Sequence, residues 1–306
     1  MKTLLDQAIK SARKYTEKGQ VATYIPELSS QNRFYLGVSF CDLEGNVSYA
    51  GDAHIPFTIQ SISKVAAFIC ALEDNDLETL NRKISFYPSN EGFNSIVSLE
   101  TRNKQKPLNP MINSGAIVTI SMVKGATLEE KFSRIFSMLL QLTNNPDLTV
   151  NPSVYQSELE TGNRNRALAY FMKSTGIIET DDVEGLLEVY FKLCSIEMTA
   201  VDLSRFAAVL AKNGIALTTN DIIFSKQSAR IVKAVMALCG MYDASGDFAV
   251  DVGLPAKSGV GGGIIAVKPK EGGFGVFGPA LDDKGNSVAG WHVLKQLSEL
   301  LDYHIF

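Results

Sequence analysis

Strand-like segments stand near both ends of the chain, and a long helical block separates them. Residues 34–42 and 46–52 flank a turn signal at 44–46 and predict a hairpin, while 262–269 and 272–280 predict two strands near the C-terminus. An isolated hairpin is at best marginally stable, so we expect the two ends to meet in one sheet. Strands grouped apart from helices favour an α+β fold over a doubly wound one.

The helical block begins near Ser61, where apolar residues start to recur at helical spacing. Two more amphipathic helices are expected at the chain ends, at 4–12 and at about 287–301, where they would flank an antiparallel sheet. We expect an active site at the interface between a sheet-containing part and an inserted all-helical part. The expected parts are 1–65 with 225–306, and 66–224.

Composition narrows the class of protein. The 306 residues contain 29 Lys plus Arg and 33 Asp plus Glu, a net charge of -4, which gives no basic footprint for nucleic acid or an anionic membrane. No apolar run approaches the roughly 18 residues that a transmembrane helix needs, and Asp6 and Gln7 interrupt the first apolar stretch, unlike in a signal peptide. The four cysteines stand far apart in apolar stretches, as buried reduced thiols do. We expect a cytoplasmic protein.

A Ser-x-x-Lys motif at Ser61–Lys64 is the strongest local sign of chemistry. Residues three apart share a helix face, so the Lys64 amine can reach the Ser61 hydroxyl. A desolvated lysine has a lowered pKa and can accept the hydroxyl proton. About one such motif is expected by chance in a chain of this size. We interpret the second copy, Ser11–Lys14, as a chance occurrence on the protein surface. It lies on the amphipathic N-terminal helix rather than before an apolar helix body.

The segment Lys257-Ser258-Gly259 opens a predicted strand and can line a cleft. Serine acyl-transfer enzymes of the β-lactamase and penicillin-binding group combine S-x-x-K with S-D-N and K-T-G, and S-D-N is absent here. The other interpretation is a Gly-rich turn between strands. Residues 261–266 also fit G-x-G-x-x-A, but that dinucleotide fingerprint requires a helix after it, and a strand follows.

Two polar segments, 109–117 and 154–172, allow two interpretations each. Asn113 precedes an apolar helix and is either an N-cap or a ligand for substrate. In the second segment Glu158, Arg164, Asn165 and Arg166 form either a solvated helix face or part of a patch for a zwitterion. In that patch a carboxylate would bind an α-amino group and amides would bind an α-carboxylate.

The remaining candidates are tyrosines and histidines. Tyr190 and Tyr242 are either half-buried core residues or proton carriers. His54, His292 and His304 are too scattered for a metal site or a Ser-His-Asp arrangement. Activation of Ser61 by lysine or tyrosine is favoured accordingly.

Taken together, these segments resemble the glutaminase family, the serine-dependent enzymes that hydrolyse L-glutamine to L-glutamate and ammonia. The resemblance runs from about Tyr24 to Leu301 and implies a fold similar to the β-lactamase/transpeptidase type, a compact bacterial form, a homodimer or homotetramer, and no cofactor or metal. The stretches that carry it are YIPEL, PFTIQSISK, NPMINSGAI, SELETGNRNRA, YFKLCSI, CGMYDASG and GLPAKSGVGGGI.

The resemblance also implies roles for individual residues. Ser61 matches the nucleophile and Lys64 its partner, and Tyr190 stands where β-lactamases use the first residue of S-D-N. Tyr242 matches a tyrosine implicated in proton transfer, and Lys257 is the counterpart of the K-T-G lysine. The backbone N–H of Val260 would form the oxyanion hole with that of Ser61. The substrate-binding positions fall on Tyr24, Ser61, Asn113, Glu158, Asn165, Tyr190, Tyr242 and Val260.

Two other functions use the same residues. A penicillin-recognising hydrolase or transpeptidase would share the Ser-Lys machinery, but the missing S-D-N and the absence of an export signal count against it. A non-catalytic amino-acid-binding module would keep the pocket without turnover, and the complete set of Ser61, Lys64, Tyr190, Tyr242 and Lys257 counts against it.

Overall fold

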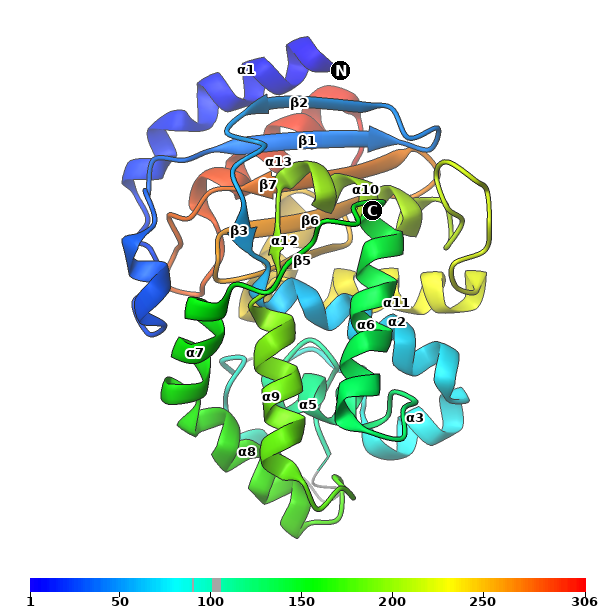
Figure 1. The fold of residues 1–306 in the computed structure, drawn as a ribbon. Coiled ribbons are helices and arrows are strands. Elements are labelled where there is room, and N and C mark those ends of the chain that lie inside the picture. Colours follow the sequence, from blue (N-terminus) through cyan, green and yellow to red (C-terminus); the bar gives the residue numbers. More distant parts are fainter. Residues whose placement is uncertain (90, 101–105) are drawn as a thin grey trace.

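The two ends of the chain meet in one antiparallel sheet. The computed structural model describes residues 1–89, 91–100 and 106–306, and in Figure 1 the sheet stands above most of the helices. Its order is β2-β1-β7-β6-β5, and β1 is paired with β7 from Gly37↔Phe277 to Asp42↔Gly272. The predicted α+β class and the predicted meeting of the ends are confirmed. The strands are β1 (Gly37–Asp42), β2 (Val47–Gly51), β5 (Ala256–Ser258), β6 (Gly263–Lys268) and β7 (Gly272–Phe277).

The first predicted strand is three residues too long. Tyr35 N–H donates to the carbonyl of Asn32 in a turn, and Leu36 N–H donates to the Asp52 carboxylate rather than to a neighbouring strand. These contacts satisfy the backbone outside the sheet, so pairing starts at Gly37.

One face of the sheet is covered by α1 (Lys2–Ala12) and α13 (Val288–Leu301), the two predicted terminal helices. Ser287 caps α13, because its hydroxyl accepts from the Gly290 N–H. The apolar face of each helix packs on the strands in one buried cluster. Its members include Leu5, Ala8, Val38, Phe40, Ile264, Phe274, Val276, Val293 and Leu297.

The other face is covered by α10 (Ala200–Ala211). Thr199 and Asp202 form the predicted capping box. The helix lies so close to β7 that a Cβ added at Gly275 would be 2.0 Å from the Ala200 carbonyl oxygen. Helix α10 belongs to the segment 66–224 but packs on the sheet, so the two-part division of the chain stays a prediction.

Helices α3, α5, α6 and α11 pack against α2, whose first nine residues, 63–71, are all buried. One short strand pair joins the two regions: β3 (Phe57–Thr58) pairs with β4 (Glu197–Met198). The prediction that the inserted part is all-helical is therefore wrong, because β4 lies within residues 66–224. The other helices are α2 (Ser63–Asp74), α3 (Leu77–Lys83), α4 (Val97–Glu100), α5 (Asn113–Ser121), α6 (Leu128–Thr143), α7 (Pro152–Thr161), α8 (Asn163–Ser174), α9 (Val183–Cys194), α11 (Lys226–Cys239) and α12 (Ser245–Asp251).

Two further sequence predictions can be compared with the structure. The four cysteines are buried and unpaired, as expected. Among the described residues, each helix is too short or too polar to cross a membrane.

Replacing Gly275 by Ala should destabilise the fold by about 1–3 kcal/mol, the usual cost of overpacking, because α10 would have to move away from β7. Chemical denaturation measures this free energy of unfolding. Gly246→Ala in α12 is the matched control, since its added Cβ has no neighbour within 4 Å, and it should be neutral or stabilising by up to about 1 kcal/mol. Equal effects of the two substitutions would contradict the close packing of α10.

Candidate active site

Ser61 lies in a 3₁₀ turn, Gln60–Ile62, between β3 and α2. The sequence predicted it at the start of the helix, and the structure places it just before the first residue of α2. Gln60 has φ 50°, a left-handed conformation that costs a non-glycine residue energy. The Ser63 hydroxyl donates to the Gln60 carbonyl at 2.8 Å, which helps to hold the turn. Ser61 is 7% exposed, so its hydroxyl is screened from bulk water.

Lys64 is buried with neutral hydrogen-bond acceptors. Its Nζ donates to Asn113 Oδ1 at 2.7 Å and to the Met111 carbonyl at 3.4 Å. Burial lowers the pKa of Lys64 to about 8, against the opposing influence of Cys194 and Glu158. A minority of the amine, much more than for a lysine in water, is therefore neutral near physiological pH. The predicted contact between Lys64 and the Ser61 hydroxyl stays a prediction.

Asn113 links Lys64 to a second amide. It is the first residue of α5, and Ile112 occupies the N-cap position without a side-chain cap, so the N-cap interpretation is wrong. Asn113 Nδ2 instead donates to Asn165 Oδ1 at 2.9 Å. Since Asn165 stands on α8, this pair joins two helices that are far apart in sequence.

Glu158 brings a carboxyl group to the same region from α7. It is buried, and burial raises its pKa to about 7, while a hydrogen bond with Gln60 and the charge of Lys64 oppose the rise. The neighbouring arginines face elsewhere: Arg164 donates to the Asn94 carbonyl and Arg166 pairs with Glu184 at 3.1 Å. For these two residues the solvated-face interpretation holds.

Tyr190 comes from α9, with the Lys64 Nζ 6.0 Å from its ring centroid. Burial raises its pKa well above the usual value for tyrosine. One turn later, the Cys194 thiol forms hydrogen bonds with Tyr190 and Ser63, and burial raises its pKa to about 12. Cys194 is a neighbour of the site that the sequence did not predict. Its i+4 spacing from Tyr190 was an available signal.

Tyr242 begins the 3₁₀ turn Tyr242–Ala244 that follows α11, and its φ is 57°. Its Oη donates to the Ser258 carbonyl at 3.3 Å. Burial raises its pKa to about 12, and hydrogen bonds with Ser61 and Ser258 limit the rise. The phenol is thus protonated and close to the Ser61 hydroxyl, where it can donate a proton.

Lys257 is fully buried beneath Tyr242, with Nζ 4.1 Å from the ring centroid. It donates to the carbonyl oxygens of Gly240 and Ser258, at 3.0 Å and 2.5 Å. Burial, followed by the charge of Lys64, keeps its pKa well below the usual value for lysine. These contacts tie Lys257 to the backbone and the Tyr242 ring.

The Gly-rich segment after Lys257 lies against the chain that leads into Ser61. A Cβ added at Gly259 would be 2.4 Å from the Ile59 carbonyl oxygen, and one at Gly261 would be 2.2 Å from that of Thr58. Only glycine permits this approach, which brings Val260 beside the Ser61 turn. The segment continues into β6, which confirms that the dinucleotide fingerprint does not apply.

Asn286 supports this arrangement and was not found from the sequence. Its Oδ1 accepts from the Ser258 hydroxyl at 2.7 Å, and its Nδ2 donates to the Met241 carbonyl at 3.4 Å. The residue is fully buried and connects the segments on either side of Tyr242. No local sequence pattern announces a contact between residues 28 positions apart.

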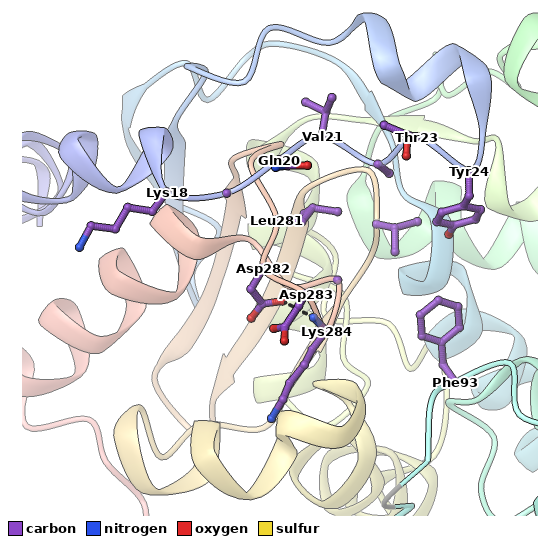
Figure 2. Close-up of a pocket in the computed structure, with 14 residues that line it drawn as sticks. Lys18, Gln20, Val21, Thr23, Tyr24, Phe93, Leu281, Asp282, Asp283 and Lys284 are labelled. Atoms are coloured by element: carbon purple, nitrogen blue, oxygen red, sulfur yellow. Dashed lines mark hydrogen bonds between the residues drawn. The ribbon is translucent and has the colours of Figure 1, made fainter.

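A cavity of about 560 Å³ adjoins these residues and includes Tyr24 and Val260 in its wall. Figure 2 shows Tyr24 and Phe93 together at one end of it, and the Phe93 ring lies 4.8 Å from that of Tyr242. Tyr24 is 54% exposed, but burial of its hydroxyl end and the charges of Tyr242 and Glu158 raise its pKa. Ser61 and Lys64 do not line the cavity.

The histidines stand apart from the site. His292 stacks on Tyr15, His54 contacts Tyr49, and His304 contacts the Val250 carbonyl. Within 1–89, 91–100 and 106–306, no group of three His, Cys, Asp or Glu side chains could hold a metal ion.

Comparison with known proteins gives one consistent result. A family model described as Glutaminase matches residues 19–306. The chain is 52% identical over 306 residues to a Glutaminase of Clostridium botulinum and 53% identical to one of Clostridium tetani, with all of both chains covered in each case. A structure titled probable glutaminase from Bacillus subtilis, complexed with 6-diazo-5-oxo-L-norleucine, has a TM-score of 0.91 and 36% identity over 100% of this chain and 97% of that one.

Proposed function

The chain belongs to the glutaminase family, and we propose that this glutaminase hydrolyses the side-chain amide of L-glutamine through an acyl-enzyme on Ser61. The observation that carries the proposal is the buried amine of Lys64, one turn from Ser61, with its pKa lowered to about 8. A lysine of that pKa can take up the serine proton near neutral pH. The ligand in the Bacillus subtilis structure has the amino-acid end of glutamine and a diazoketone in place of the amide, which is consistent with a nucleophile at this position.

Substrate recognition is assigned to the polar cluster around Lys64. The ionised Glu158 would bind the α-ammonium group of glutamine, and the amides of Asn113 and Asn165 would bind its α-carboxylate. The hydroxyls of Tyr24 and Tyr190 complete the pocket. These groups are mostly buried, where the local dielectric constant is low. Each hydrogen bond that they make to substrate is therefore stronger than the same bond in water.

In the first chemical step, Ser61 Oγ bonds to the side-chain carbonyl carbon and its proton passes to Lys64. The oxyanion accepts hydrogen bonds from the backbone N–H groups of Ser61 and Val260. The C–N bond then breaks, and the amide nitrogen leaves as ammonia with the transferred proton. In the second step water attacks the ester, Glu is released and Ser61 regains its proton.

The tyrosines and Lys257 have different parts in this scheme. Tyr242 and Tyr190, with pKa values raised to about 12 and well above normal, are protonated and suited to relay or donate protons. Lys257 acts through Tyr242 as a positioning residue, because its contacts are the ring and two backbone carbonyls. As the counterpart of the K-T-G lysine, Lys257 is expected from the resemblance to be catalytic, and we propose a positioning role in its place.

Three wider proposals rest on the family resemblance alone. We propose a β-lactamase/transpeptidase-like relationship for the fold, a homodimer or homotetramer, and a location in the cytoplasm. No observation in the described residues favours the penicillin-recognising hydrolase or the non-catalytic binding module over the glutaminase.

Ser61→Ala should fold normally and lose ammonia release from glutamine by more than the ~100- to 1000-fold that one oxyanion donor contributes, because the acyl-enzyme cannot form. Ser11→Ala is the matched control, since Ser11 belongs to the other Ser-x-x-Lys motif and is exposed. A coupled glutamate assay and circular dichroism measure the two properties. Substantial turnover by Ser61→Ala would contradict the assigned nucleophile.

The value of kcat/KM for glutamine should rise with pH across the range from about 7 to about 8. Glu158 must lose its proton, with a pKa of about 7, to bind the α-ammonium group, and Lys64 must lose one, with a pKa of about 8, to act as a base. Both changes act in the same direction, and the apparent pKa values belong to the coupled pair. Glu158→Gln should weaken the binding of glutamine but keep the part of the rise in kcat/KM that is due to deprotonation of Lys64. A flat profile through this range would exclude the scheme.

Glutamine should be preferred over asparagine by at least the ~10- to 200-fold that one methylene gives in an apolar pocket. With the α-end anchored by Glu158, Asn113 and Asn165, the shorter side chain cannot place its carbonyl at Ser61. Steady-state kinetics with both amides measure the ratio of kcat/KM. Similar values would show that the substrate is not held at both ends.

A further inference from the structure

Tyr242 is held in a backbone conformation that a tyrosine rarely adopts. Its φ of 57° lies in the left-handed region, which is unfavourable for a bulky side chain and persists only where the surroundings enforce it. In this conformation the Tyr242 hydroxyl forms hydrogen bonds with Ser61 and with the Ser258 carbonyl. The contacts that enforce the conformation therefore also position the hydroxyl beside the proposed nucleophile.

The hydrogen bond that closes the turn does not select the left-handed form. The Ala244 N–H donates to the Met241 carbonyl at 3.1 Å. Turns closed in this way most often have a negative φ at their second residue, here Tyr242, and a positive φ there is typical of Gly, Asn and Asp. The Ser245 hydroxyl, which donates to the Tyr242 carbonyl at 2.8 Å, fixes the peptide group after Tyr242. The peptide group before Tyr242, whose rotation about the N–Cα bond defines φ, is contacted from outside the turn by Asn286.

Asn286 links the two groups that position Tyr242. Its Nδ2 donates to the Met241 carbonyl at 3.4 Å, and its Oδ1 accepts from the Ser258 hydroxyl at 2.7 Å. Ser258 is also the residue whose carbonyl accepts from the Tyr242 hydroxyl. A carbonyl oxygen can only accept, so Nδ2 must face Met241 and Oδ1 must face Ser258. One carboxamide thus contacts the peptide group that sets φ and the residue that receives the tyrosine hydroxyl.

Asn286 is itself held in place by its loop. The residue is fully buried, its N–H donates to the Asp282 carboxylate at 2.8 Å, and its carbonyl accepts from the Asp282 N–H at 2.8 Å. Figure 2 shows Asp282 and Lys284 on this loop, and the Lys284 N–H donates to the same carboxylate at 3.0 Å. The next residue, Ser287, caps α13. The carboxamide therefore extends from a segment that is fixed on both sides.

A second set of contacts joins the same segments without reaching the peptide group before Tyr242. The Ser258 N–H donates to the Gly240 carbonyl at 3.2 Å, and Lys257 Nζ donates to the carbonyls of Gly240 and Ser258. These contacts remain when Asn286 is changed, and they keep β5 beside the end of α11. A variant at Asn286 should therefore fold and lose mainly the orientation of Tyr242.

We propose that Asn286 is a positioning residue, whose carboxamide holds Tyr242 in the left-handed conformation that places its hydroxyl at Ser61. The proposal rests on the function proposed above, in which Tyr242 relays or donates protons during formation and breakdown of the acyl-enzyme. None of the hydrogen-bond partners of Asn286 named above is assigned to glutamine. Its effect on the reaction is therefore exerted through the tyrosine.

A double-mutant cycle tests this role. The wild type, Asn286→Ala, Tyr242→Phe and the double variant are compared by kcat for ammonia release from glutamine, and circular dichroism checks that each protein is folded. We expect Asn286→Ala to lower kcat by about 10- to 100-fold when Tyr242 is present, because misplacing a reacting group by about 1 Å costs up to about 100-fold. In the Tyr242→Phe background the same substitution should change kcat by less than about threefold, because the hydroxyl that Asn286 positions is absent.

Asn75→Ala is the matched control. The Asn75 side chain also bridges two segments, since it donates to the carbonyls of Ala71 and Met122 at 2.9 Å each. It stands at the C-terminal end of α2, whereas Ser61 lies just before the first residue of that helix. This substitution should lower the free energy of unfolding but leave kcat near that of the parent protein in both backgrounds.

Equal losses of kcat in the two backgrounds, or a wild-type kcat for Asn286→Ala, would overturn the proposal. A wild-type kcat for Tyr242→Phe would overturn it as well, and would remove the proton-transfer role assigned to Tyr242. If Asn286→Ala does not fold, Ser258→Ala takes its place in the cycle, because it removes one of the two hydrogen bonds of the carboxamide.

A crystal structure of the same variant gives a readout that does not depend on activity. Tyr242 should leave the left-handed region, and its hydroxyl should move away from Ser61. An unchanged Tyr242 would overturn the proposal. If the wild type releases no ammonia from glutamine, the proposed function has failed, and this crystal structure alone decides whether Asn286 positions Tyr242.

Discussion

The site depends on the burial of the Lys64 amine without a carboxylate in hydrogen-bonding contact. An ion removed from water costs several kcal/mol unless a close opposite charge compensates for it, and the acceptors of Lys64 are an amide and a backbone carbonyl. Compared with a lysine in water, the neutral form of the Lys64 amine is therefore favoured relative to the protonated form. Lys257 is buried nearby, and burial, followed by the charge of Lys64, lowers its pKa. Glu158 is the carboxyl group whose charge acts on Lys64.

Burial of that kind requires elements from distant parts of the chain. Helix α2 is covered along its first nine residues, with α5, α6 and α11 as neighbours. The loop 259–261 closes the remaining side, and it does so only because Gly259 and Gly261 allow their backbone to reach the carbonyls of Ile59 and Thr58. The antiparallel sheet holds this loop through β5 and β6, so the meeting of the two chain ends is a condition for the site as well as for the fold.

The sequence allows a proposal about local chemistry, and it predicts long-range contacts only in part. Ser61 and Lys64 are three residues apart, and helical periodicity alone places them on one face. The partner of Asn113 is Lys64, 49 residues away, and nothing local distinguishes that contact from an N-cap. The same limit applies to Asn286, and to α10, whose apolar residues predict an amphipathic helix without naming the sheet as its partner. The glycines at 273 and 275 were a signal of close approach that periodicity does not use.

Two strained residues on either side of Ser61 show how the geometry is maintained. Gln60 and Tyr242 both have left-handed φ values, a conformation that costs of order 1–3 kcal/mol each and persists only where the surroundings enforce it. The enforcing contacts are present: the Ser63 hydroxyl donates to the Gln60 carbonyl, and the Ser245 hydroxyl donates to the Tyr242 carbonyl, each at 2.8 Å. Lys257 adds its contact beneath the Tyr242 ring. Because packing rather than substrate holds these conformations, the hydrogen bond between the Ser61 and Tyr242 hydroxyls is part of the folded structure itself, and the buried Lys257 helps to hold Tyr242 in place.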